Sequence, residues 1–390
     1  MALPGAMGIT DIANATKTIY EQVTGQRALT PTNEADIISL ATTTLQMGAD
    51  PMINAISQMV NRTIFSVRPY TRKFKGMEYS ASQYGNHVRK IVPLGTNILP
   101  TEQYTSSAEA GVDMYKAPEN EALQFNIYGQ KVYDMPLKIY KDQLDSAVRN
   151  VEELGSLFQM WVTHASNNKE QVLEALARNL LCNFIGGKNQ MDADHVIHLL
   201  TEYNEVTGQQ LTEAQVSQPE NYTSFVQWAF GRIKTISDKL TERVTGNHWN
   251  VTGKKVLRHT PYEYQRLYLL SPRMNDIATR VFSNTFNDEY LKLMDYEAVN
   301  FWQNPDNEYA VKVTPAVLST TGAIGTGTEQ SLTNVFGVLS DVEAFGYNVF
   351  NNWSAVTPLN ASGGYWVDWT HFTTRWFTDY TENGYVFLMD

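Results

Sequence analysis

The stretch VEELGSLFQMWVTHASNNKEQVLEALARNLLCNFI, residues 151–185, decides the fold that we expect for this chain. Apolar side chains recur in it every three or four residues and predict one buried helix face: Val151, Leu154, Phe158, Trp161, Val162, Ala165, Val172, Leu176, Leu180 and Phe184. Gly186 and Gly187 predict the end of this helix, because glycine accepts the positive φ of a C-terminal cap. At about 1.5 Å per residue the helix would be roughly 50 Å long, so we expect an extended subunit that neighbours support.

The composition is that of a folded protein with 390 residues, of which 43% are hydrophobic and 12% aromatic. It allows two or three domains or one elongated subunit. The single cysteine, Cys182, excludes a disulfide within one chain, and we interpret it as a small core residue rather than a nucleophile. The N-terminal residues MALPGAM do not resemble a signal peptide, and no apolar run is long enough to predict a transmembrane helix.

The net charge of −11 is unevenly distributed. Residues 281–390 hold three Lys and Arg against thirteen Asp and Glu, a net charge of −10. Residues 68–90, in contrast, hold six basic residues and one acidic residue, Glu78. These two regions would attract each other between copies of the chain, or they are two solvated faces that never meet. The sequence leaves both alternatives open.

The first part of the chain predicts an arm followed by two short helices. Residues 1–33 are low in hydrophobicity and predict an arm that is either extended or becomes ordered on assembly. Residues 35–47 and 52–64 predict helices, the second with Asp50 as its N-cap and Pro51 at its first position.

A long β-arm is expected next. Residues 87–94 and 123–134 predict strands that flank the polar residues 95–120. A structureless connection of this length is unusual inside a compact domain, so we expect the arm to reach across another subunit. Pro136 predicts a break between the second strand and the long helix.

The remaining chain predicts mixed helix and strand. After a polar connector at residues 187–220, the expected helices are 222–244, 261–270 and 273–286, and the expected strands are 255–259, 293–302, 309–317, 335–349, 365–377 and 385–388. Residues 351–364 predict a loop. Asn383 followed by Gly384 is typical of a type I′ hairpin turn before the last strand.

Three patterns in the sequence are candidate functional sites. The first candidate is a possible metal site formed by Asp192, Asp194, His195 and His198. No other region of the sequence supplies matching ligands, which favours a solvated turn over a metal site. The glycine-rich residues 322–327 lack the Lys-Ser/Thr ending of a phosphate loop, which favours a surface loop. The aromatic residues within 365–377 could stack on sugar rings, but strands that pack on the long helix explain them better. We therefore expect no catalytic residue, no cofactor, no metal site and no enzyme activity.

The order of these parts resembles the HK97-type α+β fold of tailed-phage major capsid proteins from about residue 61 onward. Within this class it is most similar to the capsid proteins of phi29-like podophages. The segments that carry this similarity are RKFKG at 72–76, residues 133–148 leading into 152–187, residues 225–240, and GYWVDW at 364–369. Because the β return runs up to Asp390, we expect no appended immunoglobulin-like domain of the kind found in that group.

The resemblance implies a division of the chain into capsid domains. The expected parts are an N-terminal arm with two short helices at 1–64, an E-loop β-arm at 65–135, a P-domain at 136–220 with the spine helix 151–185, the main part of an A-domain at 221–349, and a P-loop with a β return at 350–390. It implies a major capsid protein that self-assembles into the hexamers and pentamers of an icosahedral or prolate shell around the genome of a tailed dsDNA bacteriophage. The alternatives are an encapsulin-like nanocompartment shell with cargo enzymes, and an enzyme or sugar-binding protein of unrelated fold.

The same resemblance implies partners. Residues 1–64 are too short for a built-in scaffolding domain, so we expect a separate scaffolding protein, together with a portal protein at one vertex. Packaged dsDNA would make only weak, non-specific contacts, because no basic groove interleaved with aromatic residues is visible. We expect no membrane contact, assembly in the cytoplasm of the host bacterium, and a final location in the virion capsid. We expect no covalent cross-link between Lys116 and an Asn of a neighbouring subunit.

Overall fold

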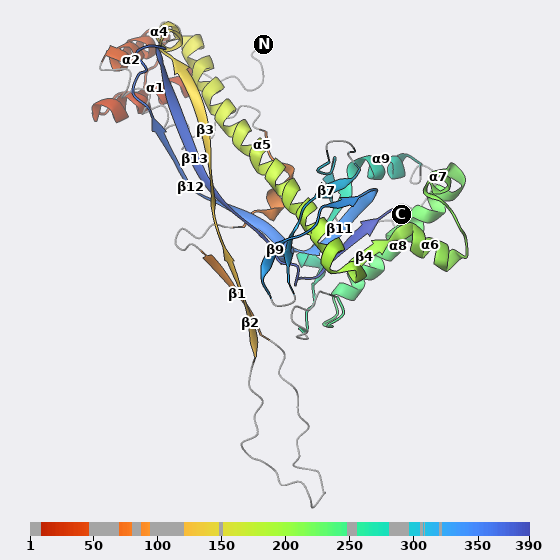
Figure 1. The fold of residues 1–390 in the computed structure, drawn as a ribbon. Coiled ribbons are helices and arrows are strands. Elements are labelled where there is room, and N and C mark those ends of the chain that lie inside the picture. The colour runs from red at the N-terminus through yellow and green to blue at the C-terminus, as the bar shows by residue number, and fades with distance from the viewer. Residues whose placement is uncertain are drawn as a thin grey trace, which may run out of the picture. The chain divides into compact units, whose positions relative to one another are not determined.

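The computed structural model of the chain divides into two compact units (Figure 1). The residues that the structure describes are 9–46, 70–79, 87–93, 121–147, 151–247, 256–280, 296–304, 307, 309–319 and 322–390. Unit 1 comprises Met1–Gly85, Gly129–Leu176 and Tyr347–Arg375, and unit 2 comprises Asn86–Tyr128, Ala177–Gly346 and Trp376–Asp390. The long helix and two long strands contribute residues to both units.

The long helix α5 runs from Val151 to Met191 and does not end at residue 185 as predicted. Gly186 and Gly187 lie within the helix, at positions where other side chains pack directly against its backbone. A Cβ on Gly186 would lie 2.6 Å from Val313, and a Cβ on Gly187 would overlap the ring of Tyr380. The predicted glycine cap is therefore wrong, since these glycines make room for neighbouring side chains.

The buried face of α5 also differs from the prediction in its middle. Its buried apolar residues are Leu154, Leu157, Trp161, Leu173, Ala177, Leu180, Leu181, Cys182, Phe184 and Ile185. Leu173 is fully buried, whereas Val172 is 36% exposed and Leu176 is half-buried. The apolar stripe is interrupted because Asn167, Glu170 and Glu174 bind the polar segment 70–79 instead.

Unit 1 begins with two helices, α1 at Ile9–Thr24 and α2 at Glu34–Gln46. An extended conformation of the arm at 1–33 is therefore wrong for residues 9–24, whereas ordering on assembly stays a prediction. The low average hydrophobicity conceals a narrow apolar face, which packs against α2 and the start of α5; the shared core contains Ala15, Ile19, Ala41, Leu154, Leu157 and Trp161. The helix predicted at 52–64 lies outside the described residues.

A three-stranded sheet completes unit 1, in the order β12-β13-β3. Its strands are β3 at Lys131–Tyr140, β12 at Phe345–Val356 and β13 at Tyr365–Thr378; a short helix, α4 at Lys141–Ala147, follows β3. Pro136 does not break β3 but lies within it, opposite Trp369. The edge position of β3 explains this, because an edge strand tolerates a residue without an N–H. The first half of α5 covers one face of this sheet through the core around Trp161, Ile139 and Trp366 (Figure 1).

Unit 2 contains a five-stranded sheet in the order β4-β14-β11-β5-β6. Its strands are Val196–His198, Gly384–Leu388, Val335–Asp341, Gln265–Leu270 and Tyr296–Val299 in that order. Helices α6 at Leu199–Thr207, α7 at Glu213–Val216, α8 at Pro219–Leu240 and α9 at Ser271–Arg280 complete it. The apolar faces of α8 and the sheet form one core, in which Phe225, Ile233, Leu269 and Phe387 are buried.

Several local predictions in unit 2 are corrected. Residues 261–270 form a single turn, Tyr262–Tyr264, followed by strand β5, and not one helix. The described part of the strand predicted at 255–259 contains only an isolated bridge from Arg258 to Val244. Asn383 and Gly384 do not form a hairpin, because β13 and β14 lie in different sheets. A Cβ on Gly384 would lie 2.6 Å from Phe184, so this glycine also serves close packing.

Two predicted loops contain strands. Within residues 322–327, β9 at Ile324–Thr326 pairs with β8 at Ala316–Leu318, beside a second pair of β7 at Val311–Val313 with β10 at Gln330–Leu332. Within residues 351–364, β12 continues to Val356, so the loop is shorter than predicted.

The described part of the β-arm is a two-stranded ribbon that belongs to unit 2. Strand β1 at His87–Pro93 pairs antiparallel with β2 at Ala122–Tyr128, with Pro93 opposite Ala122. The predicted strand 123–134 is divided at Gly129, whose φ of 96° separates β2 from β3. The expected arm tip at 95–120 lies outside the described residues.

Candidate functional site

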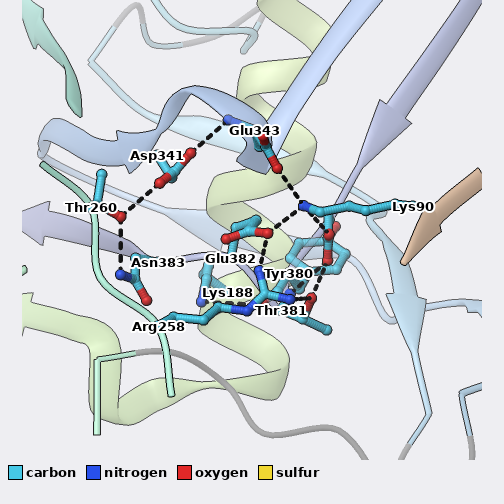
Figure 2. Close-up of polar contacts among 11 residues, drawn as sticks. Lys90, Lys188, Arg258, Thr260, Asp341, Glu343, Tyr380, Thr381, Glu382 and Asn383 are labelled. Carbon is cyan, nitrogen blue, oxygen red and sulfur yellow. Dashed lines mark hydrogen bonds and ion pairs between the residues drawn. The ribbon is translucent and has the colours of Figure 1, made fainter. Parts of the chain in front are cut away.

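A buried polar cluster of unit 2 joins the β-arm to the C-terminal part of the chain. Lys90 of β1 extends its ammonium group among three carboxylates, as Figure 2 shows. Its Nζ atom lies 3.0 Å from Glu343 Oε2 and 3.1 Å from Asp379 Oδ2, and it pairs closely with Glu382. We call Glu343, Asp379 and Glu382 the acidic cluster. The side chains of Asp379 and Glu382 are each only 9% exposed, whereas Glu343 is 59% exposed.

The acidic cluster is held in place by residues other than Lys90. Asp379 Oδ1 accepts hydrogen bonds from the backbone N–H of Thr381 at 2.9 Å and from its hydroxyl at 2.5 Å. The guanidinium of Arg258 pairs with Glu382 and donates to the Thr381 hydroxyl at 3.3 Å. Burial lowers the pKa of Arg258, against the opposing charge of Asp379. Contacts other than those with Lys90 therefore hold the carboxylates of Asp379 and Glu382 in defined positions.

A second set of hydrogen bonds positions the turn that carries Glu343 (Figure 2). The hydroxyl of Thr260 donates to Asp341 Oδ2 at 2.6 Å and accepts from the Asn383 amide at 3.0 Å. Asp341 Oδ1 in turn accepts the backbone N–H of Glu343 at 2.8 Å. Asn383, placed by the sequence in a surface turn, is thus a fully buried member of this network.

The candidate metal ligands are only partly brought together. His195 Nδ1 lies 2.5 Å from Asp192 Oδ1, and its Nε2 lies 3.1 Å from the Gly246 carbonyl oxygen. His198 pairs with Asp390 instead, and Asp194 is exposed. Among the residues that the structure describes, no three His, Cys, Asp or Glu side chains are grouped to hold a metal ion.

Asp192 has a further partner that sequence reasoning missed. Lys188 is completely buried, and its Nζ donates to Asp192 Oδ2 at 2.8 Å and to the Tyr380 carbonyl at 3.3 Å. Burial lowers the pKa of Lys188, and the charge of Asp192 opposes this shift. The i,i+4 spacing of Lys188 and Asp192 was the available signal. These residues stabilise the end of α5 and its connection to β4.

The other candidates are part of the core or of a sheet. Burial raises the pKa of Cys182 to about 12, and its Sγ accepts the backbone N–H of Gln303, which confirms a core role. Within the aromatic run, Trp366 packs under α5 as predicted. Trp353, 47% exposed, stacks on His371 with ring centroids 3.9 Å apart. The phosphate-loop candidate 322–327 contains strand β9 and a surface turn.

In unit 1, the segment that precedes the β-arm is anchored to α5. Arg72 is buried and pairs with Glu78 and with Glu170 of α5, and its guanidinium lies over the ring of Tyr347 at 5.7 Å. Burial alone would lower the pKa of Arg72, but Tyr347 and the two carboxylates outweigh it and the pKa is raised. Burial raises the pKa of Tyr347 to about 12. The backbone N–H of Tyr70 also donates to Asn167 of α5 at 2.9 Å.

The sequence left open whether the basic and acidic regions attract each other between copies of the chain or are solvated faces that never meet. Neither alternative includes the contact that the structure shows. The basic region and the acidic C-terminal region meet within a single chain, where Lys90 pairs with the acidic cluster. Net charge by region indicated an attraction but not its partners, because Lys90 and Asp379 are 289 residues apart in the sequence. No pattern in the sequence singles out Arg258 or Thr260.

Comparison with known proteins identifies the class of fold. No protein-family model matches the chain, and no curated protein sequence matches it. The chain is similar to a chain in the capsid structure of Staphylococcus phage Andhra, with a TM-score of 0.52 and 10% identity over 85% of this chain and 87% of that one. It is also similar to a chain in a structure of the head fiber and inner core protein gp22 of native bacteriophage P68, with a TM-score of 0.50 and 10% identity over 84% and 87%.

The chain therefore has the HK97-like α+β fold of phage capsid proteins, which confirms the predicted fold class. At 10% identity the likeness is one of fold. The closer similarity to phi29-like podophages stays a prediction. No helix among the described residues combines the length and apolarity needed to cross a membrane.

Proposed function

We propose that this chain is the major capsid protein of a tailed dsDNA bacteriophage. Its copies would assemble into the hexamers and pentamers of an icosahedral or prolate shell around the genome. The observation that carries this proposal is the HK97-like fold, which extends over 85% of the chain in the comparison with the phage Andhra capsid. The β1–β2 ribbon adds support, because among the described residues it pairs with no other strand, and a two-stranded ribbon gains stability by packing against a further surface.

The proposed domains follow the predicted division with adjusted boundaries. The E-loop would comprise the β1–β2 ribbon and its tip, residues 94–120. Unit 1 would hold the P-domain and unit 2 most of the A-domain, with α5 as the spine helix. The P-loop would be the connection between β12 and β13, residues 357–364.

The proposed role is structural and not catalytic. The other proposed partners are a separate scaffolding protein, a portal protein at one vertex, and packaged dsDNA through weak, non-specific contacts. Assembly would take place in the cytoplasm of the host bacterium, and the protein would end in the virion capsid. The similarity to phage structures favours this reading over an encapsulin-like shell with cargo enzymes.

Deletion of residues 106–112 tests the proposed E-loop. This change removes part of the expected arm tip and leaves the described residues of both units in place. We expect a folded, soluble subunit that does not form closed shells, measured by electron microscopy and by thermal unfolding. Val206→Ser, at a residue of α6 that is 71% exposed, serves as the control and should form shells. Wild-type particle yield from the deletion variant would overturn the E-loop assignment.

A further inference from the structure

The backbone leaves the direction of the β1–β2 ribbon weakly determined. Among the described residues, β1 and β2 form a sheet of their own and pair with no other strand. The ribbon joins β3 through Gly129, which has a φ of 96° and no atoms within 4 Å of the position of a Cβ. This glycine serves backbone conformation and not close packing. Side-chain contacts must therefore fix the direction of the ribbon relative to the rest of unit 2.

Lys90 supplies such a contact, because its positive charge balances the negative charges of the acidic cluster. The acidic cluster combines three carboxylates from two segments of the chain, Glu343 before β12 and Asp379 with Glu382 after β13. Figure 2 labels Glu343 and Glu382 beside Lys90. Without Lys90, the nearly buried carboxylates of Asp379 and Glu382 would keep only the ion pair with Arg258 and the charge of Lys188, which forms its own ion pair with Asp192. Buried charges without a counter-charge are costly, so the cluster favours a cation at the position of Nζ.

We propose that Lys90 and the acidic cluster form an ionic latch that fixes the β1–β2 ribbon to the C-terminal part of unit 2. Lys90 is a positioning residue: it sets the direction of the ribbon before another copy of the chain binds it. If the proposed capsid function holds, a subunit with an open latch presents its ribbon in many directions and closes shells less efficiently. The latch itself rests only on the geometry within one chain.

Hydrogen exchange of the full-length chain tests the latch directly. The readout is amide exchange in residues 87–93 and 122–128, compared with exchange in α8. Lys90→Met removes the ammonium group and keeps the length of the side chain. Arg89→Gln is the matched control, because Arg89 is the exposed neighbour whose side chain points to the opposite face of the ribbon.

The latch predicts that Lys90→Met accelerates exchange in the ribbon by about tenfold or more and leaves α8 unchanged. Arg89→Gln should stay within about twofold of the wild type. Ribbon exchange in Lys90→Met equal to that of the wild type would overturn the proposal. This readout does not require shells, so failure of the latch and failure of the capsid function are distinguishable.

Loss of exchange protection in α8 would reveal that Lys90→Met does not fold. A second variant keeps the test decisive in that case. Glu343→Gln removes the most exposed carboxylate and leaves Asp379 and Glu382 paired with Lys90. We expect a smaller acceleration, about twofold to fivefold, confined to the ribbon. Unchanged ribbon exchange in a folded Glu343→Gln protein would also overturn the latch.

Discussion

Gly187 in the second half of α5 lies against the ring of Tyr380, so closely that a Cβ on Gly187 would overlap the phenol. The Tyr380 hydroxyl lies 2.7 Å from the Ala316 carbonyl oxygen and 3.0 Å from the Asn183 side-chain amide. These hydrogen bonds leave the ring little room to move. The contact fastens the long helix to the segment that also carries Asp379 and Glu382.

Gly187→Ala should destabilise the protein although alanine favours helices. Helix propensity alone would stabilise the variant by about 1 kcal/mol, but overpacking against Tyr380 typically costs about 1–3 kcal/mol. Gly231→Ala in α8 is the matched control, because no atom lies within 4 Å of its Cβ position. We expect thermal unfolding at a lower temperature for Gly187→Ala and at an equal or higher temperature for Gly231→Ala. A more stable Gly187→Ala protein would contradict the observed packing.

Leu173→Ala should be among the most destabilising truncations in α5. Leu173 is fully buried, so its loss should cost about 2–5 kcal/mol of unfolding free energy. Its neighbour Val172 is 36% exposed, and Val172→Ala should change stability by no more than about 0.5 kcal/mol. Urea unfolding of the two variants measures the difference. Equal effects would mean that the buried face of α5 is placed one residue from where the structure has it.

Arg72→Met should destabilise unit 1 by leaving Glu78 and Glu170 without their shared counter-charge. The Arg72 side chain is only 6% exposed, but Glu78 and Glu170 are 27% and 22% exposed and stay partly solvated, so breaking these pairs should cost about 1–3 kcal/mol. Lys75→Met is the control, since Lys75 is exposed in the same short segment, and it should stay within about 0.5 kcal/mol of the wild type. Chemical denaturation compares the two, and similar stability of both variants would refute the anchoring role of Arg72.

Asp192 should make the stability of unit 2 depend on acid pH. Burial alone would raise the pKa of Asp192, but the hydrogen bond from His195 and the charge of Lys188 outweigh it and the pKa is lowered. The unfolded chain then binds the proton more tightly. The contribution of Asp192 is therefore present above its unfolded pKa of about 3.9 and is lost as the pH falls through the folded pKa.

The variant Asp192→Asn isolates this contribution. At pH 7 we expect it to be less stable than the wild type by about 3 kcal/mol or more, because it leaves the buried Lys188 without its anion. The difference should shrink as the pH falls below about 4. Urea unfolding at several pH values measures it. A difference that stays the same at pH 3 would contradict the lowered pKa.

The sequence predicted the elements whose local patterns are long and unambiguous. The presence of the long helix α5, the paired strands of the β-arm and the aromatic strand β13 follow from spacing, although the end of α5 and the middle of its buried face do not. Glycine and proline were misread because their meaning depends on tertiary position. Gly187 and Gly384 serve close packing, not chain reversal, and Pro136 is allowed because β3 is an edge strand.

The candidate site could be predicted only in outline. Regional charge indicated that the basic and acidic regions attract each other, but pairing Lys90 with Asp379 and Glu382 required the sheet topology that brings them together. The buried role of Asn383 was hidden for the same reason. Local rules assign Asn-Gly to a turn, whereas its amide here bonds Thr260 in the interior.

Electron microscopy of the purified protein tests the central claim most directly. The full-length chain would be expressed alone and, separately, with the reading frames next to its gene. The capsid proposal predicts closed shells, tubes or rings of six subunits, and co-packaged enzymes within the shells would point to a nanocompartment instead. A monodisperse small particle under every condition would contradict the proposed function.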